Sequence, residues 1–199
     1  MANIQLLLLA AGASSRMKEP KQLLSWNNTT LIEHQLQNLI HTNNNVSVVL
    51  GAYSKEIQKV IKQLPVSIYT NPNWKNGMGN SIAFGVNELL KKDKTIDGIL
   101  ISLIDQPLLT TEYFNKMLEC FQTDKKQIIV SQSENGWLGA PVLFDKIYFE
   151  ELLNLNGDEG AKMVISKNKN TVQLISADTF LQDMDTPKAY QNLLEKFKK

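Results

Sequence analysis

Three positively charged side chains follow a run of small residues near the start of the chain. Residues 6–24, LLLLAAGASSRMKEPKQLL, change abruptly from apolar to small side chains and then bring Arg16, Lys18 and Lys21. Small residues allow a ligand to approach the backbone closely, so that N–H groups can bind phosphate oxygens. Arg16 can then contact a phosphate through its forked guanidinium, and Lys21 as a point charge. Because small residues after a strand also form ordinary turns, the spacing alone leaves both interpretations open.

Three carboxylates, in two segments of the chain, occupy positions where a divalent metal ion could bind. Asp105 directly follows an apolar segment, and Asp183 and Asp185 are two residues apart in QDMDTP. Mg²⁺ often takes one or two carboxylates together with substrate phosphates. In an extended segment Asp183 and Asp185 project to the same side, so one or both can complete a metal site with Asp105. The alternatives are that Asp105 caps the next segment and that Asp185 only helps to start the last helix.

A glycine-containing loop, NGMGNS, precedes another helical pattern and is a third candidate. Gly77 allows close backbone contact with a ligand, and Ser81 is either a helix N-cap or a residue that contacts a nucleotide base. The segment Gly157–Gly160 has a similar pattern, but a capped turn explains it better. The first segment is neither a Walker loop nor a dinucleotide fingerprint, because Gly-Lys-Ser/Thr and the second glycine are missing.

The elements that must position these residues alternate between strands and helices. Strands are expected over residues 4–9, 46–50, 66–69, 99–103, 128–131, 141–144 and 172–175, and helical apolar spacing covers residues 32–40, 57–64, 82–90 and 114–121. The strand at 141–144 reads as antiparallel to the others. This alternation predicts an α/β fold with a mostly parallel mixed sheet covered on both faces. Ligands then bind at the carboxyl ends of the strands, where the charged residues lie.

Local signals predict where several helices begin. Thr30 and Glu33 form a capping-box pattern, and Ser54 is expected to cap the following helix. Thr186 is the expected N-cap of the terminal helix, with Pro187 at its first position.

Composition narrows the class of protein. The 199 residues carry 21 basic and 20 acidic side chains, a net charge of +1, which provides no overall field for nucleic acid or a membrane surface. The single cysteine, Cys120, indicates a reducing, cytoplasmic setting. The apolar start of the chain is short and lacks a preceding basic segment, so we interpret it as a buried strand rather than a signal peptide. We expect one domain spanning residues 1–199.

The motifs together resemble a known family. LAAGASSRMKEPKQLL resembles LAAGxSxRMGxxKxLL, the signature of the molybdenum-cofactor nucleotidyltransferases, and especially of the molybdopterin cytidylyltransferases. NPNWKNGMGNSIAFGV, IDQP, GAPVLF, NGDEGAK and DMDTP are similar to later landmarks of that family. The resemblance implies a single three-layer, Rossmann-like nucleotidyltransferase domain that uses a nucleoside triphosphate and Mg²⁺.

The resemblance also implies roles for individual residues. Arg16, Lys21 and Asp105 would be catalytic, Asp105 would bind the metal with Asp183 or Asp185, and Gly77 and Ser81 would lie against the base. The nucleotide would be bound by these residues and by the segment Leu9, Ala10, Ala11, Gly12, Ala13, Ser14 and Ser15. Alanine at position 11, where guanylyl-transferring relatives usually have glycine, favours CTP.

Two departures from the family pattern concern opposite ends of the site. Lys18 replaces a glycine that usually follows "RM". Gly139-Ala140-Pro141 replaces "GHP", and Leu138 stands where a polar or basic residue is common, on what we expect to be the acceptor side. The donor half of the site therefore matches the family better than the acceptor half does.

The resulting hypothesis is transfer of CMP from CTP to the phosphate of molybdopterin, with release of pyrophosphate, for a molybdenum hydroxylase as client enzyme. One alternative keeps the chemistry but uses another phosphorylated acceptor, such as a sugar phosphate. A second alternative is a non-catalytic chaperone that binds a nucleotide or a finished cofactor. A metal-dependent glycosyltransferase is a weaker rival, since its Asp-x-Asp normally ends a strand in the middle of the chain.

Overall fold

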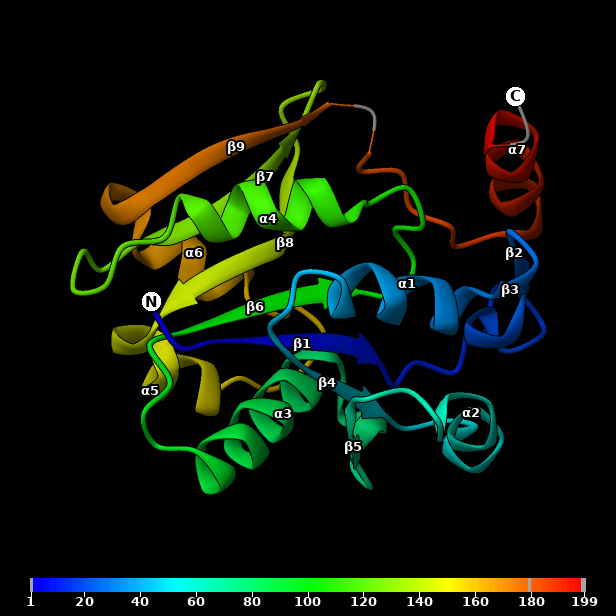
Figure 1. The fold of residues 1–199 in the computed structure, drawn as a ribbon, viewed down its shortest axis with the longest axis horizontal. Coiled ribbons are helices and arrows are strands. Elements are labelled where there is room, and N and C mark those ends of the chain that lie inside the picture. Colours follow the sequence, from blue (N-terminus) through cyan, green and yellow to red (C-terminus); the bar gives the residue numbers. More distant parts are fainter. Residues whose placement is uncertain (1, 179, 198–199) are drawn as a thin grey trace.

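The computed structural model describes residues 2–178 and 180–197, and a mixed β-sheet forms its centre. The strand order is β5-β4-β1-β6-β8-β7-β9, which Figure 1 shows from the β5 edge to the β9 edge. All neighbours are parallel except at β8, which runs antiparallel to both β6 and β7. The strands are β1 (Ile4–Ala10), β4 (Asn45–Leu50), β5 (Ser67–Thr70), β6 (Gly98–Leu103), β7 (Ile128–Ser133), β8 (Leu138–Asp145) and β9 (Val172–Asp178).

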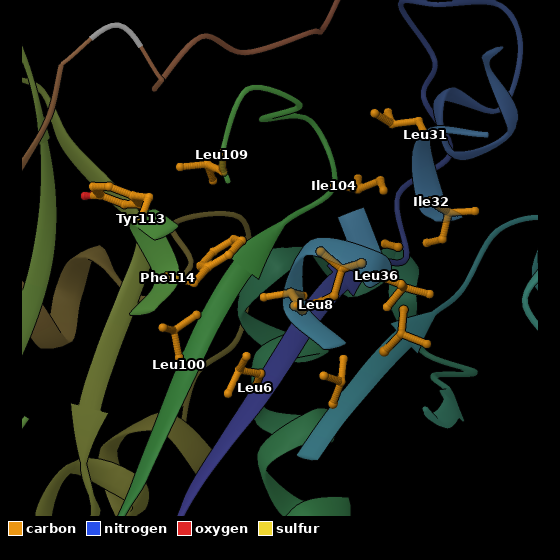
Figure 2. Close-up of a cluster of buried hydrophobic side chains, with 14 of the residues drawn as sticks. Leu6, Leu8, Leu31, Ile32, Leu36, Leu100, Ile104, Leu109, Tyr113 and Phe114 are labelled. Atoms are coloured by element: carbon orange, nitrogen blue, oxygen red, sulfur yellow. The ribbon is translucent and has the colours of Figure 1, made fainter. Parts of the chain in front are cut away.

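Helices cover both faces of this sheet. One apolar cluster packs β1, β4 and β6 against α1, α2 and α4, and a second packs the opposite face against α3, α5 and α6. Figure 2 shows part of the first cluster, in which Leu6 and Leu8 of β1 face Leu36 of α1 and Phe114 of α4. The helices are α1 (Leu31–Ile40), α2 (Ser54–Ile61), α3 (Met78–Lys92), α4 (Thr111–Glu119), α5 (Phe149–Leu153), α6 (Lys162–Lys167) and α7 (Pro187–Phe197).

The apolar sequence of β1 follows from its central place in the sheet. All seven residues of β1 are buried, because helices cover both of its faces and β4 and β6 flank it. A strand in this position needs a nearly continuous apolar run rather than alternation, and the one polar residue of β1, Gln5, donates through Nε2 to Asn3 Oδ1 at 3.0 Å. The predicted α/β fold with a mostly parallel mixed sheet is therefore confirmed, as is the antiparallel direction of the strand that contains residues 141–144.

Of the three predicted helix starts, two are confirmed and one is wrong, and one of the two interpretations of Ser81 is excluded. Thr30 and Glu33 form the capping box of α1, and Thr186 Oγ1 accepts a hydrogen bond from the Ala189 N–H. Ser54 is not a cap: α2 follows Tyr53, whose left-handed backbone (φ 56°) makes the turn instead. Ser81 is not a cap either, because α3 already begins after Gly77.

The C-terminal helix lies beside a small hairpin that the sequence pattern did not predict. This hairpin consists of β2 (Ser25–Trp26) and β3 (Thr29–Thr30), and α7 lies next to it (Figure 1). The Tyr190 hydroxyl of α7 donates a hydrogen bond to the Ser25 carbonyl at 2.7 Å. None of the helices within the described part of the chain is long and apolar enough to cross a membrane.

Candidate active site

A polar cavity of about 490 Å³ opens where β1 and β6 end. Its walls come from the loop after β1, from a short 3₁₀ helix at Lys21–Leu23, from the start of α3 and from the segment before α7. Of the residues expected to bind nucleotide or metal, all but two line it. Those lining it are Leu9, Ala11, Gly12, Ala13, Ser14, Ser15, Arg16, Lys21, Gly77, Ser81, Asp105 and Asp185. Ala10 is buried in the sheet, and Asp183 lines a neighbouring cavity instead.

Gln22 determines the shape of the loop after β1, and sequence reasoning missed it. The side chain of Gln22 is fully buried, and its Nε2 donates to the carbonyl oxygens of Ala10 and Gly12 at 2.9 Å each. Ser14 Oγ donates to Gln22 Oε1 at 3.5 Å and accepts from the Lys21 N–H at 3.1 Å. A buried carboxamide with these partners fixes the loop. Its position next to Lys21 in an otherwise apolar PKQLL segment was the available signal.

Lys18, which replaces a glycine of the family signature, has a backbone conformation that explains the usual glycine. Its backbone is left-handed, with φ of 66°, and its side chain is exposed. Glycine adopts this conformation without strain, whereas a lysine does so at a cost. The structure therefore shows why this position suits glycine, and Lys18 keeps the same turn.

Lys21 joins two carboxylates that lie 80 residues apart in the chain. Its Nζ is 3.0 Å from Asp105 Oδ2 and 2.7 Å from Asp185 Oδ1, and its side chain is only 10% exposed. Arg16 reaches the other oxygen of Asp185, with Nη2 2.7 Å from Oδ2. Burial would lower the pKa of Lys21, but Asp105 and Asp185 outweigh it and raise the pKa above its usual value. Lys21 is therefore fully cationic at neutral pH.

The segment around Asp185 is attached directly to the end of β6. The Met184 N–H donates to the Asp105 carbonyl at 2.8 Å, and the buried Gln106 donates through Nε2 to Asp183 Oδ1 at 3.3 Å. Burial would raise the pKa of Asp185, but Lys21 and Arg16 lower it. By contrast, desolvation and the charge of Asp105 raise the pKa of Asp183. The two aspartates thus have different surroundings although they are only two residues apart.

One buried carboxylate oxygen at this site has no hydrogen-bond partner among the described residues. Asp105 Oδ1 is buried and accepts no hydrogen bond from any described residue. A buried carboxylate oxygen without a donor is costly, and a bound cation would satisfy it. Within residues 2–178 and 180–197, no group of three or more His, Cys, Asp or Glu side chains is arranged to hold a metal ion. Asp105 and Asp185 thus form a pair of carboxylates beside the loop after β1.

The start of α3 forms the opposite wall of the cavity. Gly77 has φ of 97°, and a Cβ there would overlap the Gly157 carbonyl, so this contact requires glycine. The Gly79 N–H donates to the Gly157 carbonyl at 2.8 Å, and the Gly157 N–H donates to the Asn76 carbonyl at 3.1 Å. Ser81 is buried inside α3 and accepts from Asn71 Nδ2 at 3.2 Å. The turn at Gly157–Gly160, predicted to be only a capped turn, therefore helps to position this wall.

A second, smaller cavity of about 230 Å³ adjoins the first. The two cavities share six wall residues: Leu9, Met78, Leu103, Asp105, Asp158 and Asp185. The remaining walls of the second cavity are mainly apolar and come from β6, β8 and the segment that leads into α6. Of the two residues expected on the acceptor side, Ala140 lines this cavity, whereas Leu138 packs against the apolar core. Trp137 also lines it and was not singled out from the sequence.

Comparison with known proteins places this geometry in a family. Residues 6–172 match the MobA-like NTP transferase domain. The molybdenum cofactor cytidylyltransferase of Escherichia coli K12 is 23% identical over 199 residues, which cover 99% of this chain and 98% of that protein. The probable molybdenum cofactor guanylyltransferase of Bacillus cereus AH187 is 34% identical over 131 residues, which cover 65% of this chain and 62% of that protein.

Solved structures share the fold. Rv0371c from Mycobacterium tuberculosis H37Rv superposes with a TM-score of 0.84 at 24% identity, over 98% of both chains. A complex of Rv0371c with manganese superposes with a TM-score of 0.80 at 23% identity, over 98% of this chain and 99% of that one. The match to the family extends from β1 into β9 and includes every residue that lines the first cavity except Asp185. The chain therefore belongs to the MobA-like NTP transferase family, and with it to the nucleotidyltransferases of the molybdenum cofactor.

Proposed function

We propose that this nucleotidyltransferase transfers CMP from CTP to the phosphate of molybdopterin and releases pyrophosphate. The observation that carries the proposal is the position of Lys21, whose Nζ lies between Asp105 and Asp185 at the edge of a cavity lined by the loop after β1. A cation and two carboxylates beside exposed backbone N–H groups are what a metal-bound triphosphate needs.

The loop after β1 has the features of a triphosphate site. A Cβ at Gly12 would meet no protein atom within 4 Å, and its backbone is not left-handed, so the fold itself does not require glycine there. The open space in front of Gly12 suits close approach of a phosphate. The side chain of Arg16 is 69% exposed and pairs with Asp185 through Nη2, so an entering anion can reach the other N–H groups of the guanidinium.

Asp105 and Asp185 are the residues that we propose to hold Mg²⁺. The unpartnered Oδ1 of Asp105 supports this assignment, because a bound cation would give this buried oxygen a partner. When bound, Mg²⁺ would neutralise charge on the transferring and leaving phosphates. We assign the second ligand to Asp185 rather than Asp183, because only Asp185 lines the same cavity as the loop after β1.

The chain's own residues address the main barrier, which is the approach of one anion to another. Lys21 and Arg16 supply positive charge next to the bound triphosphate, so that charge developing on the pyrophosphate is stabilised. The attacking phosphate of the acceptor is already ionised at neutral pH and needs no general base. This agrees with His34, the half-buried histidine of α1, whose Nε2 contacts the Pro107 carbonyl at 3.1 Å rather than the cavity. Burial also lowers the pKa of His34.

CTP is the donor that we propose, for two reasons. Ala11 stands where guanylyl-transferring relatives usually have glycine. In addition, the relative named as a cytidylyltransferase aligns along nearly the whole chain, whereas the one named as a guanylyltransferase aligns along 65% of it. The lone Cys120 supports a cytoplasmic setting, where a molybdenum hydroxylase would receive the product.

A different phosphorylated acceptor is the second candidate. The replacement of "GHP" by Gly139-Ala140-Pro141 and the apolar walls of the second cavity favour it, because they alter the side where the acceptor would bind. The chemistry and the donor would stay the same. A non-catalytic chaperone is less well supported, since it would need no cluster of Lys21, Asp105 and Asp185.

The test is pyrophosphate release with each of the four nucleoside triphosphates and Mg²⁺, with and without molybdopterin. We expect release only with CTP and molybdopterin together. Release with CTP and another phosphate monoester would favour the second candidate. Release that is equal for GTP would contradict the assignment of CTP, and no release with any pair would contradict catalysis.

A further inference from the structure

Trp137 is held in a fixed position at the mouth of the second cavity. It follows the tight turn between β7 and β8, where Gly136 has φ of 78°. The Ser133 N–H donates to the Trp137 carbonyl at 3.0 Å, and the Trp137 N–H donates to Ser133 Oγ at 3.1 Å. These two hydrogen bonds fix the backbone of Trp137 although the turn itself is exposed.

The indole ring of Trp137 lies directly over Gly139. A Cβ at Gly139 would overlap the indole, with the six-membered ring as its nearest neighbour. Gly139 has ordinary backbone angles, so its lack of a side chain serves this contact and not a special turn. Trp137 nevertheless remains 40% exposed, which is high for the largest apolar side chain. The indole of Trp137 thus packs against Gly139 and remains accessible to a ligand.

The rest of the second cavity suits a flat, mostly apolar group that ends in an anion. Leu9, Val142 and Phe144 contribute apolar walls. Lys162 is the only lysine or arginine among the residues lining it, and its ammonium makes no ion pair with another side chain in the described parts of the chain. A volume of about 230 Å³ is below the roughly 300 Å³ at which drug-sized sites begin, and so suits a fused bicyclic ring.

The cavity also opens onto the reacting groups. Asp105 and Asp185 belong to the walls of both cavities, so a ligand in the second cavity can extend its phosphate toward a triphosphate in the first. Carboxylates line one side of the second cavity: Asp105, Asp158, Glu159, Asp183 and Asp185. On the side of Trp137, the side chains of β6 and β8 are apolar and offer no hydrogen-bond partners to the hydroxyl groups of a sugar. An aromatic surface is complementary to a planar ring and costs little conformational entropy when it is held in advance.

We propose that Trp137, supported by Gly139, determines acceptor specificity by stacking on a planar fused-ring acceptor, and that Lys162 attracts the acceptor's anionic group. This inference rests on the proposed function, since it assumes that the second cavity binds the acceptor. It concerns binding alone and involves no covalent step. Stacking of a heteroaromatic ring on an aromatic side chain contributes enough to change affinity about 10- to 100-fold.

The experiment measures acceptor binding without any nucleotide, so that it does not depend on catalysis. The probe is 6-hydroxymethylpterin phosphate, titrated by calorimetry into the parent protein and into Trp137→Ala, Trp137→Phe and Gly139→Ala. We expect the dissociation constant to rise about 10-fold or more for Trp137→Ala. Gly139→Ala should behave in the same way because the new methyl group displaces the indole. Trp137→Phe should retain binding within about threefold, because it keeps an aromatic surface.

Lys162 has a matched control on the same helix. Lys167 pairs with Glu151 at 3.2 Å and does not line the cavity. Lys162→Ala should weaken binding of the phosphorylated pterin about fivefold and leave binding of unphosphorylated 6-hydroxymethylpterin unchanged, since a charge-assisted contact is lost. Lys167→Ala should change neither.

The outcomes are distinguishable from failure of the proposed function. Unchanged binding in both Trp137→Ala and Gly139→Ala would overturn the proposal, as would tighter, Trp137-dependent binding of glucose 1-phosphate than of the pterin. If the pterin binds as expected but no pyrophosphate is released with any triphosphate, the proposed reaction fails and the role of Trp137 stands. CTP binding serves as the folding control, because Trp137 does not line the first cavity.

Discussion

The two cavities that meet at Asp105 and Asp185 are built by different means. The larger one is formed by a backbone loop and by ion pairs that join segments far apart in the chain. The smaller one is formed by side chains of β6, β8 and the segment before α6, with Trp137 resting on a glycine. The first therefore depends on charge and on loop shape, and the second depends on apolar contact. We infer that the larger cavity, the proposed donor site, is the less tolerant of substitutions.

The wall between the cavities is itself held together by backbone contacts. Two hydrogen bonds join the start of α3 to the loop at Gly157, and Met78 lies between the cavities on this wall. A Cβ at Gly160 would press against the Met78 sulfur, so the packing extends along the whole loop. Changes in either cavity can therefore be interpreted separately only if this wall remains intact.

The largest expected effect on activity comes from substituting Asp105, which lines both cavities. Asp105→Asn should reduce kcat about 10³-fold and abolish its dependence on Mg²⁺, since the amide cannot replace a carboxylate ligand. The measurement is pyrophosphate release across a Mg²⁺ titration, with thermal unfolding to confirm the fold. Asp93→Asn, far from the cavities on the helix end before β6, is the matched control. An unchanged Mg²⁺ dependence in Asp105→Asn would contradict the assignment.

Removing the cation of the donor cavity comes next. Lys21→Ala should reduce kcat about 10²-fold or more, because it removes a charge that stabilises the transition state. Lys91→Ala, which breaks only an exposed pair with Glu88, should leave kcat unchanged. Activity within twofold of the parent in Lys21→Ala would show that the ion cluster is structural.

Two glycines of the site should respond in opposite ways. Gly12→Ala should raise the KM for CTP about tenfold and leave the free energy of unfolding unchanged, because its methyl group enters open space. Gly79→Ala should lower the free energy of unfolding by about 1–3 kcal/mol, because its Cβ would press against the Asn156 backbone. Urea unfolding and initial rates test the pair. Equal destabilisation by both changes would show that the loop after β1 is packed rather than open.

The smallest effect concerns the strained turn after Arg16. Lys18→Gly should raise the free energy of unfolding by about 1 kcal/mol at most, because glycine relieves the left-handed conformation but adds freedom to the unfolded chain. The KM for CTP should stay within about twofold, since the turn keeps its shape. Clear destabilisation in urea would mean that the Lys18 side chain contributes more than the strain costs.

Local sequence signals predicted the fold and most of the residues that line the larger cavity, for identifiable reasons. Buried strands such as residues 4–9 need continuous apolar runs, and the capping box at Thr30 and Glu33 is a contact between residues near in sequence. The prediction that Ser54 caps α2 was wrong because the turn before this helix is made by the left-handed backbone of Tyr53, without a capping side chain.

The features that were missed depend on contacts between distant segments. The hydrogen bonds of Gln22 go to carbonyls 10 and 12 residues earlier, and the position of Gln22 in the PKQLL segment does not identify those partners. Trp137 reads as part of a turn until the structure shows the indole over Gly139 at a cavity mouth. The difference between Asp183 and Asp185 likewise arises from Lys21, which lies more than 160 residues away.

The central claim is that the two cavities have separate tasks, and one binding experiment tests it directly. Equilibrium dissociation constants for Mg²⁺–CTP and, separately, for 6-hydroxymethylpterin phosphate are measured with the parent, Lys21→Ala and Trp137→Ala proteins. We expect Lys21→Ala to weaken CTP binding about tenfold or more without affecting the pterin, and Trp137→Ala to do the reverse. If each variant weakens both ligands equally, the two cavities act as one site and the account is contradicted.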